Sequence, residues 1–432
     1  LEKQLKTNPN ATALEVLQGK EDTKAPLLQS SWSFADLDHA VRAIANGLLN
    51  EGVEPGDFLL LRLTSDTPFA LTYLGAIAAG IVPVLLSPLL SVKEVAFFIK
   101  DTGAKHIAWS PSLPIPETNG ITLIKEQAII NFIEQTPLAD YAETKENDPA
   151  FLIYTSGTTS QPKGVLHTQR TIKGRIPMRD GWHQMKAGDR VLHAGDFNWT
   201  YTLGIGLLDP WMWGATSLIF RGKKTPALWP ELIRQHKPTI FAAVPGVFRQ
   251  ILKHAPPQKD DLTTLRYCLS AGETLPADLH QQWKQVTGKS IYEALGQSEI
   301  STYVSTAEGL NIPDSAMGRI QKGRKVVILP EEDTNDEIAT KPLGPNQQGL
   351  IAVHITDPGL MLHYWQRPDE MQNCFRGEWF ISGDSGTIDE HQNLTHHGRI
   401  DDIMNAGGYR VSPLEVESAL LSSELVSEAA VT

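Results

Sequence analysis

Residues 154–168 have the sequence Tyr-Thr-Ser-Gly-Thr-Thr-Ser-Gln-Pro-Lys-Gly-Val-Leu-His-Thr and lie between two apolar runs, Phe151–Tyr154 and Val165–Leu166. Backbone N–H groups and hydroxyls in such a turn can donate hydrogen bonds to phosphate oxygens. The turn is not a Walker A motif, in which lysine stands between Gly and Ser/Thr, because Pro162 precedes Lys163 and Gly164 follows it. The alternative is a solvated linker, but linkers rarely place Pro-Lys-Gly directly before a strand. The pattern therefore predicts an anion-binding turn.

Size and charge narrow the class of protein. A chain of 432 residues is longer than one ordinary core, so two or three subdomains are expected. A hydrophobic content of 41% and a charged content of 20% are typical of a globular protein. The net charge of −12 disfavours nucleic acids and anionic membranes as partners. The cysteines are Cys268 and Cys374, which give no disulfide framework and favour a reducing cytoplasm.

Helix-like and strand-like segments alternate from about Phe34 to Tyr303, which predicts parallel sheets with helices on both faces. The expected helices are 34–51, 67–79, 92–102, 231–236 and 281–286, and the expected strands are 58–63, 81–86, 106–108, 239–243 and 290–293. Phe69–Leu90 is apolar enough to suggest a membrane span. However, Gly80, Pro83 and Pro88 divide it into a helix and a strand, so no membrane span is expected.

The pattern changes between about Gly318 and Leu394. Short β-branched strands (326–329, 350–354 and 378–381) alternate there with turn residues, which predicts a compact antiparallel subdomain. A charged turn, a Gly-Gly pair and a helix at 414–421 follow Arg399, and residues 429–432 have the pattern of a strand that begins. The predicted fold class is α/β, with two doubly wound, mostly parallel sheets, a small antiparallel β subdomain and the start of a small α+β domain.

Motifs spread over the whole chain together resemble one family. Residues 155–164 are similar to the phosphate loop of the AMP-forming adenylating enzymes (acyl-CoA synthetases, luciferases and peptide-synthetase adenylation domains), although Ser160 replaces the usual Gly. Tyr292–Glu299 resembles the family's Tyr-Gly-x-Thr-Glu, with Leu295 in place of the usual aromatic residue, and Ile381–Asp384 resembles Thr-Gly-Asp. The resemblance implies a large AMP-binding domain over residues 1–397, with the β subdomain at about 315–397. Residues 398–432 would then form a hinge and the beginning of a C-terminal domain.

The resemblance implies an ATP site with Mg²⁺ as cofactor. Glu299 would ligate the ion with Thr158 or Thr159 close by, since Mg²⁺ prefers oxygen ligands and is held by few protein groups. Glu299 could instead be a surface acid, and Glu273 could be an ordinary acid at a helix start. The predicted catalytic residues are Lys163, Thr158, Thr159, Glu299 and Arg399, with Glu299 and Thr158 as metal ligands. The predicted nucleotide-binding residues are Thr155, Ser156, Gly157, Thr158, Thr159, Lys163, Gly272, Glu273, Thr274, Leu295, Gly296, Gln297, Ser298, Asp384 and Arg399.

Two further segments have counterparts in the family. Gly398–Asp402 resembles its hinge, which implies that Arg399 contacts ribose or phosphate and that Asp401 is the pivot of a domain rotation. In residues 407–411, Arg410 would approach phosphate and Gly408 would leave room for the pantetheine arm of CoA. A plain turn is the alternative for the Gly-Gly pair. The family's catalytic lysine would fall beyond Thr432.

The acid substrate is indicated by weaker signals. By resemblance, the predicted acyl pocket comprises Trp199, Thr200, Tyr201, Gly204, Ala271 and Gly296, with Ser301–Tyr303 as further candidate walls. Each aromatic residue could equally belong to the core. An aromatic residue at 201 disfavours an amino-acid substrate, because amino-acid-activating relatives place an aspartate near that position. Glycine at 296 stands where acetate-specific relatives carry Trp, so a longer acid is expected to fit and Gly296→Trp to shorten it.

The sequence therefore predicts an AMP-forming acyl-CoA synthetase, similar to the medium-chain and benzoate ligase branches. Its substrates would be a medium-chain or aromatic carboxylic acid, ATP and CoA, and a homodimer is an additional expectation. One alternative is an adenylating enzyme that loads a carrier-protein phosphopantetheine. Another is a nucleotide-binding relative without catalysis.

Overall fold

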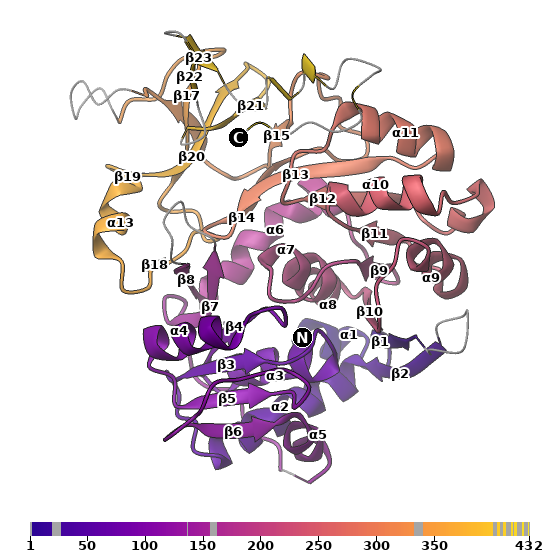
Figure 1. Ribbon diagram of the computed structural model, residues 1–432, viewed down its shortest axis with the longest axis vertical. Helices are drawn as coiled ribbons and strands as arrows, with labels where there is room; N and C mark the ends of the chain where they lie inside the picture. Colours follow the sequence, from indigo (N-terminus) through magenta and orange to yellow (C-terminus); the bar gives the residue numbers. More distant parts are fainter. Residues whose placement is uncertain are drawn as a thin grey trace.

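The computed structural model describes residues 2–19, 27–135, 137–155, 162–331 and 340–400, followed by 404–406, 409–411, 416–417, 419–420, 426 and 431. Two large sheets dominate these residues (Figure 1). One lies in the lower part of the view, and the other extends through the middle and upper parts. The outermost hairpin pairs β22 (Met404–Ala406) with β23 (Tyr409–Val411).

The first sheet is parallel at its centre. Its strand order is β18-β8-β7-β4-β3-β5-β6, in which pairing is antiparallel between β18 and β8 and between β8 and β7. The bounds are β3 (Phe58–Arg62), β4 (Val82–Leu85), β5 (His106–Trp109), β6 (Thr122–Lys125), β7 (Pro149–Thr155), β8 (Lys163–Thr168) and β18 (His363–Tyr364). Residues 156–161 of the predicted anion-binding turn lie outside the described residues, between β7 and β8.

Successive side chains of β3 point to opposite faces of this sheet, and both faces are buried. Leu59 and Leu61 pack against helices α2 (Phe34–Asn50) and α3 (Thr67–Ala78), whereas Leu60 packs against Phe98 of α4 (Val92–Thr102). Helix α5 (Glu126–Gln135) packs beside α2. Capping boxes begin two of these helices, with Ser33 and Asp36 at α2 and with Ser91 and Glu94 at α4.

The second sheet contains fourteen described strands. Its parallel part, bounded by the antiparallel edge strand β2, has the order β2-β1-β10-β9-β11-β12-β13. These strands are β1 (Thr12–Gln18), β2 (Leu27–Ser33), β9 (Arg190–His193), β10 (Thr216–Arg221), β11 (Ile240–Ala242), β12 (Tyr267–Ala271) and β13 (Ile291–Gln297). Helices α9 (Leu228–His236), α10 (Pro245–His254) and α11 (Ala277–Thr287) cover one face through Trp229, Phe248 and Trp283.

Short helical turns cover the opposite face, where Trp182 packs on Tyr267 and Leu269. These turns are η1 (Gln169–Arg175), α6 (Ile176–Met178), η2 (Arg179–His183), α7 (Thr200–Leu203), η3 (Gly204–Leu208) and α8 (Asp209–Trp213). The remaining short elements are α1 (Glu2–Thr7) and η4 (Lys259–Leu262).

The predicted antiparallel region extends the second sheet. Strand β14 (Ser301–Ser305) pairs with β13 and β15, and the order continues as β15-β21-β20-β17-β16. The bounds are β15 (Gly318–Ile320), β16 (Val326–Leu329), β17 (Gly349–His354), β19 (Phe375–Arg376), β20 (Trp379–Ile388) and β21 (Asn393–Arg399), with α13 (Pro368–Asn373) before β19. Antiparallel pairing between β13 and β14 therefore joins the parallel and antiparallel parts into one sheet.

The expected elements agree closely with this structure, and the predicted α/β class with two sheets is confirmed. Helix α4 and strand β16 have the expected bounds, and Phe69–Leu90 divides into α3 and β4. Among the described residues, no helix is both long and apolar enough to cross a membrane. Half of the predicted helix at 414–421 lies outside the described residues, and so does the predicted strand start at 429–432 except for residue 431.

Candidate active site

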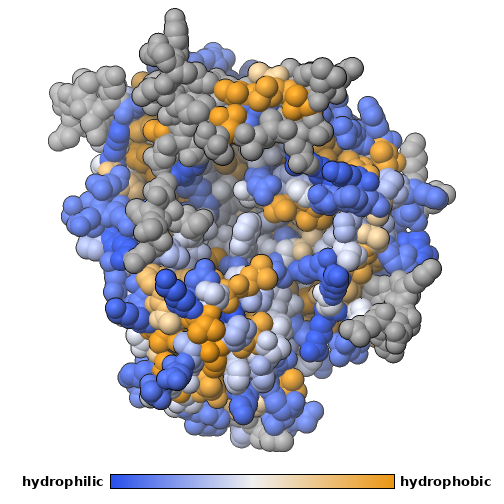
Figure 2. Space-filling model, in the orientation of Figure 1, coloured by the Kyte–Doolittle hydropathy of each residue, from blue (hydrophilic) through white to orange (hydrophobic). Residues whose placement is uncertain are grey.

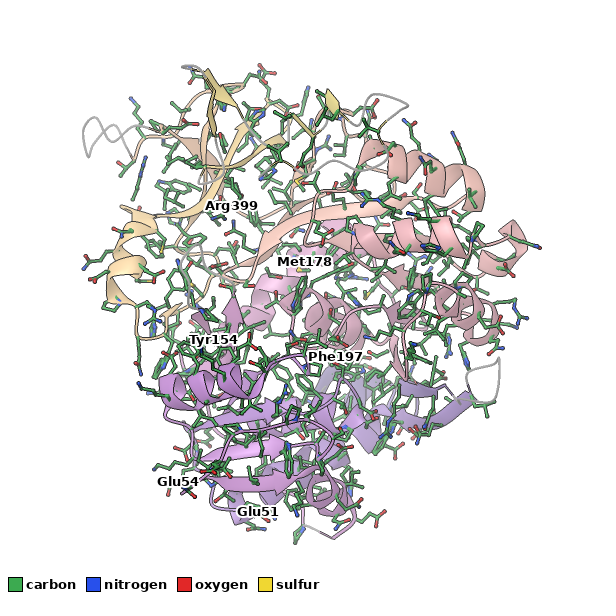
Figure 3. The ribbon with its side chains drawn as sticks, viewed as in Figure 1. Glu51, Glu54, Tyr154, Met178, Phe197 and Arg399 are labelled. Carbon is green, nitrogen blue, oxygen red and sulfur yellow. The ribbon has the colours of Figure 1, made fainter. Side chains whose placement is uncertain are left out.

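A cavity of about 1030 Å³ lies between the two sheets. Its walls include residues from β7 and β8 of the first sheet and from β12, β13, β14, β20 and β21 of the second. Figure 2 shows a hollow between the lower and upper parts of this face of the molecule. Figure 3 labels Tyr154, Met178 and Arg399, which line this cavity from β7, α6 and β21. A cavity of this size fits a nucleotide-sized ligand.

Lys163 is the first residue of β8 and lines the cavity. Its ammonium forms a salt bridge with Glu370 of α13 and lies 5.6 Å from the ring centre of Tyr364. Thr155, at the end of β7, lines the same wall. Ser156, Gly157, Thr158 and Thr159 lie outside the described residues. Strand pairing of Thr155 with Lys163 therefore fixes the two ends of the predicted phosphate turn.

Glu299 lies on the same side of the cavity as Lys163. Its Oε1 accepts a 2.8 Å hydrogen bond from the Tyr364 hydroxyl. The segment before it is held by His167, whose Nε2 lies 2.7 Å from the Ser298 carbonyl oxygen. Since a carbonyl only accepts, Nε2 carries the proton, and burial lowers the pKa of His167 to about 4, so the ring is neutral. Strand β8 thus positions both Lys163 and the Ser298–Glu299 segment.

The predicted ribose site centres on Asp384, which is 4% exposed. Its Oδ2 accepts a 2.6 Å hydrogen bond from Gln297 Nε2, and its Oδ1 lies 3.3 Å from His396 Nε2. Arg399 pairs with Asp384 across β20 and β21, and its Nη1 lies 4.0 Å from Oδ1. Ser382, Gly383 and Arg399 line the cavity, whereas Asp384 lies directly behind this wall. A ribose would therefore reach Asp384 only after Gln297 moves away.

The predicted adenine segment follows β12. Ala271 and Gly272 line the cavity, and Glu273 and Thr274 are exposed beyond them. Gly272 has φ of 95°, a conformation that favours glycine. The next turn is held from beneath, because Leu275 N donates a 2.6 Å hydrogen bond to Glu293 Oε1. Burial raises the pKa of Glu293 to about 7.

Leu295 lies in the core and not on the cavity wall. It is 9% exposed and belongs to the cluster that includes Ile300 and Val304. Leu295, predicted to bind the nucleotide, therefore does not line the described cavity, because its side chain is packed in the core. Its neighbours Gly296, Gln297 and Ser298 do line the cavity.

The predicted acyl pocket forms the other part of the cavity. Trp199, Thr200, Tyr201, Ala271 and Gly296 line it, and Trp199 is 52% exposed at its mouth. The Tyr201 hydroxyl donates to the Leu269 carbonyl oxygen at 3.0 Å, which leaves its ring facing the cavity. Gly204 lies behind this wall, where a Cβ atom would come within 2.7 Å of Arg175 Nη1.

Gly296 has a role that differs from the expected open floor. A Cβ atom there would collide with the Ser301 carbonyl group and would lie 2.6 Å from Thr302 Cα. The pairing of β13 with β14 also shifts register between Leu295 and Gly296. The expectation that Gly296→Trp simply shortens the pocket is therefore wrong, because the neighbouring backbone leaves no space for any side chain.

Comparisons with known proteins agree with this geometry. Residues 1–365 match the family model described as AMP-binding enzyme. The chain belongs to this AMP-binding enzyme family. It is 30% identical over 420 residues to benzoate–CoA ligase from Thauera aromatica, with 93% of this chain and 77% of that protein covered. It is also 30% identical to mitochondrial acyl-coenzyme A synthetase ACSM1 from Mus musculus, with 93% and 72% covered.

A solved structure supports the same assignment. The benzoate CoA ligase from Burkholderia xenovorans LB400 matches with a TM-score of 0.84 and 25% identity, over 100% of this chain and 84% of that chain. The predicted family, the predicted enzyme class of AMP-forming acid–CoA ligase, and ATP and CoA as substrates are confirmed by these relatives. The roles of single residues, the metal ion and the dimer stay predictions.

Sequence patterns missed several residues of this AMP-binding enzyme that line the cavity. Arg175, Met178, Trp182 and Ile205 come from the short helical turns between β8 and α8. Arg175 pairs with Asp209, which is 34 residues away, so no local spacing indicated it. Tyr364 and Glu370 also reach the cavity, from a segment in which the sequence predicted no site residue.

The predicted hinge and CoA-proximal residues are only partly described. Asp401 and Gly408 lie outside the described residues. The backbone of Arg410 pairs with that of Asn405 in the β22–β23 hairpin.

Proposed function

We propose that this AMP-binding enzyme adenylates a medium-chain or aromatic carboxylic acid with ATP and then transfers the acyl group to CoA. The observation that carries the proposal is the composition of one continuous cavity. Lys163, Glu299 and Arg399 line one part of it, and Trp182, Tyr201 and Ile205 line another. A charged nucleotide and a largely apolar acyl group can therefore be bound at the same time.

In the first half-reaction, a carboxylate oxygen of the acid would attack the α-phosphorus of ATP and release pyrophosphate. The attacking group is already ionised at neutral pH, so no general base is required. The protein's contribution is to hold the two reactants together and to neutralise negative charge. Lys163 and Arg399 supply positive charge, and the donors of residues 155–159 are proposed to hold the phosphates.

Contacts in the described structure indicate what must change when ATP binds. Lys163 is paired with Glu370, and Asp384 accepts from Gln297. Phosphate would compete with Glu370 for the Lys163 ammonium, and ribose hydroxyls would compete with Gln297 for Asp384. Both exchanges replace one charged or charge-assisted contact by another, so each is feasible at small net cost.

Glu299 fits the proposed Mg²⁺ site. One carboxylate oxygen accepts from Tyr364, and the other has no hydrogen-bond partner among the described residues. No group of three or more His, Cys, Asp and Glu side chains suited to a metal occurs among those residues, as expected for an ion held mainly by phosphate and water. When bound, Mg²⁺ would neutralise charge on the phosphates. Thr158 is proposed as the second protein ligand.

In the second half-reaction, the CoA thiolate would attack the acyl carbonyl carbon and displace AMP. Asp401 is proposed as the pivot of the domain rotation that admits CoA, with Gly408 and Arg410 near its path. A cytoplasmic location and a homodimer also stay predictions. The acid is proposed to be medium-chain or aromatic because the relatives include a benzoate–CoA ligase and the apolar walls suit such groups.

A panel of carboxylic acids tests the proposal. The full-length protein is incubated with ATP, Mg²⁺, CoA and each acid, and AMP release is measured. Release with benzoate-like or six- to eight-carbon acids, an approximate range set by the cavity size, supports the proposal. Release with amino acids alone contradicts it. Release that requires an acyl carrier protein in place of CoA would favour the carrier-loading alternative, and ATP binding without turnover would favour a non-catalytic relative.

A further inference from the structure

A buried ion pair joins Arg175, which lines the cavity, to Asp209 behind it. Arg175 is 5% exposed and Asp209 is fully buried. Arg175 Nε and Nη2 donate to the two carboxylate oxygens of Asp209, each at 2.6 Å. Its third nitrogen, Nη1, donates to Ser301 Oγ at 3.0 Å. A guanidinium has five N–H donors, so one on Nη1 and one on Nη2 have no acceptor among the described residues.

Backbone features at two positions keep this arrangement in place. Gly204 leaves the space that the guanidinium fills, since a Cβ atom there would lie 2.7 Å from Nη1. Ser301 has φ of 69°, in the left-handed region that favours glycine. Such a conformation is unfavourable for a non-glycine residue and is typical of functional sites. The fold thus retains a strained serine whose hydroxyl contacts Arg175.

Apolar side chains lie beside these polar groups. Met178 Sδ lies 3.7 Å from Ser301 Oγ, and Trp182 and Ile205 line the same cavity. Trp182 Nε1 is already used, because it donates to the Tyr292 carbonyl oxygen at 3.0 Å. An acid that ends in a hydrocarbon group would cover the remaining N–H donors of Arg175 without accepting a hydrogen bond from them. Leaving a buried polar group without a hydrogen-bond partner is unfavourable.

The polar end differs from the phosphate part of the cavity. Lys163 and Glu299 are grouped with Glu370 and Tyr364, whereas Arg175 and Ser301 are grouped with Met178. In Figure 3, Met178 lies in the middle of the molecule, apart from the labelled Tyr154 and Arg399. A substrate whose carboxylate faces the phosphates would therefore extend its other end towards Arg175.

The charges around Arg175 indicate which substrate group can bind beside it. Asp209 neutralises Arg175 through two hydrogen bonds, and His183, whose Nε2 lies 3.9 Å from Asp209, is fully buried. Burial lowers the pKa of His183 to about 4, so it adds no positive charge at neutral pH. A second carboxylate would lack a cation of its own. A neutral hydroxyl can accept from Arg175 and donate to Ser301 Oγ.

We propose that the acid activated by this protein carries a hydroxyl group at the end opposite its carboxylate, and that Arg175 and Ser301 bind this hydroxyl. The inference rests on the proposed acyl-adenylating function and specifies its substrate class.

Binding of non-reactive acyl-adenylate mimics tests the proposal without turnover. Acyl-sulfamoyl adenosines are prepared with benzoyl, 3-hydroxybenzoyl, 4-hydroxybenzoyl and 3-carboxybenzoyl groups, and with hexanoyl and 6-hydroxyhexanoyl groups. Dissociation constants are measured by calorimetry. We expect at least one hydroxylated mimic to bind about tenfold or more tightly than its unsubstituted partner, which corresponds to about 1.4 kcal/mol. Equal or weaker binding of every hydroxylated mimic overturns the proposal, as does tightest binding of the carboxylated mimic.

Variants at Ser301 identify the residue responsible. Ser301→Ala and Ser301→Gly both remove the hydroxyl, but only glycine relieves the left-handed backbone. The preference for the hydroxylated mimic over its unsubstituted partner should fall to within about threefold in both variants. A structural role alone would instead separate the two variants, with Ser301→Gly behaving like the parent protein.

A control variant at Ser305 and the mimics without a hydroxyl group distinguish failure of this inference from failure of the proposed function. Ser305 lies on the same strand, but its hydroxyl donates to the Gly181 carbonyl oxygen away from the cavity. Ser305→Ala should keep the preference of the parent protein, and loss of the preference there would contradict the assignment to Ser301. If no mimic binds, the proposed function itself fails. If the unsubstituted mimics bind as well as the hydroxylated ones, only the present inference fails.

Discussion

The two parts of the cavity differ in how their polar groups are held. On the phosphate side, Lys163 and Asp384 are paired with Glu370 and Gln297, groups that a nucleotide would replace. On the acyl side, Arg175 is paired with Asp209, which is fully buried and would stay paired when an acid binds. In the proposed reaction the first part would exchange its contacts, whereas the second would keep the contacts that it already has. Groups that bind a charged co-substrate can be paired with other side chains until that substrate binds. Groups that select the acid must keep their positions whether or not the acid is bound.

The largest expected effect concerns the buried ion pair of Arg175 and Asp209. Asp209→Ala leaves the Arg175 guanidinium buried without its counter-charge, and we expect a loss of about 3–5 kcal/mol in the free energy of unfolding. Urea denaturation measures it. The double variant Arg175→Met/Asp209→Leu removes both charges and should recover most of the loss. If Asp209→Ala is as stable as the parent protein, the acyl side is not preformed in the way the contacts indicate.

The next effect concerns chemistry on the phosphate side. Glu299→Gln keeps the size of the side chain but removes the charge proposed to hold Mg²⁺. We expect ATP–pyrophosphate exchange by the full-length protein to fall about 10²–10³-fold, as when one group that stabilises developing charge is removed. The thermal midpoint should change little, since Glu299 is half-buried and its side chain has one hydrogen bond to the part of the chain that the structure describes. Unchanged exchange would remove Glu299 from the mechanism.

A third variant tests the boundary between the two parts. Gly296→Ala adds a methyl group that collides with the Ser301 carbonyl group, so we expect a loss of about 1–3 kcal/mol in unfolding free energy. Gly246→Ala is the matched control, because no atom lies within 4 Å of its added Cβ and the residue is in helix α10. This control should be neutral or slightly stabilising. Equal stability of the two variants would show that β13 and β14 can separate at Gly296.

The smallest effect concerns the salt bridge between Lys163 and Glu370, which ATP would replace. Glu370→Gln frees Lys163 from its salt bridge, so ATP should bind a few-fold more tightly, while stability changes by less than about 1 kcal/mol because both groups are partly exposed. Calorimetric titration with ATP measures the affinity. Glu390→Gln, an exposed change outside the cavity lining, is the control. Weaker ATP binding by Glu370→Gln would mean that Glu370 supports the phosphate site and does not compete with it.

The sequence by itself determined the alternation of elements, because the periods of helices and strands are local properties. Helix α4 has the expected bounds, since its capping box and terminal glycine lie within thirteen residues of each other. The predicted phosphate-site residues Lys163 and Glu299 also line one cavity, as motif resemblance implied. Such motifs are short and end at strand termini, so a linear pattern can identify them.

Only the tertiary structure decided the acyl end of the cavity and the contacts that fill the phosphate side. Arg175 meets Asp209 and Ser301 across 34 and 126 residues, and Gln297 meets Asp384 across 87. The strand pairing that closes the space at Gly296 is likewise invisible in the sequence, where glycine suggested an open floor. Burial and pairing depend on which segments fold against one another, and no local period or spacing encodes that choice.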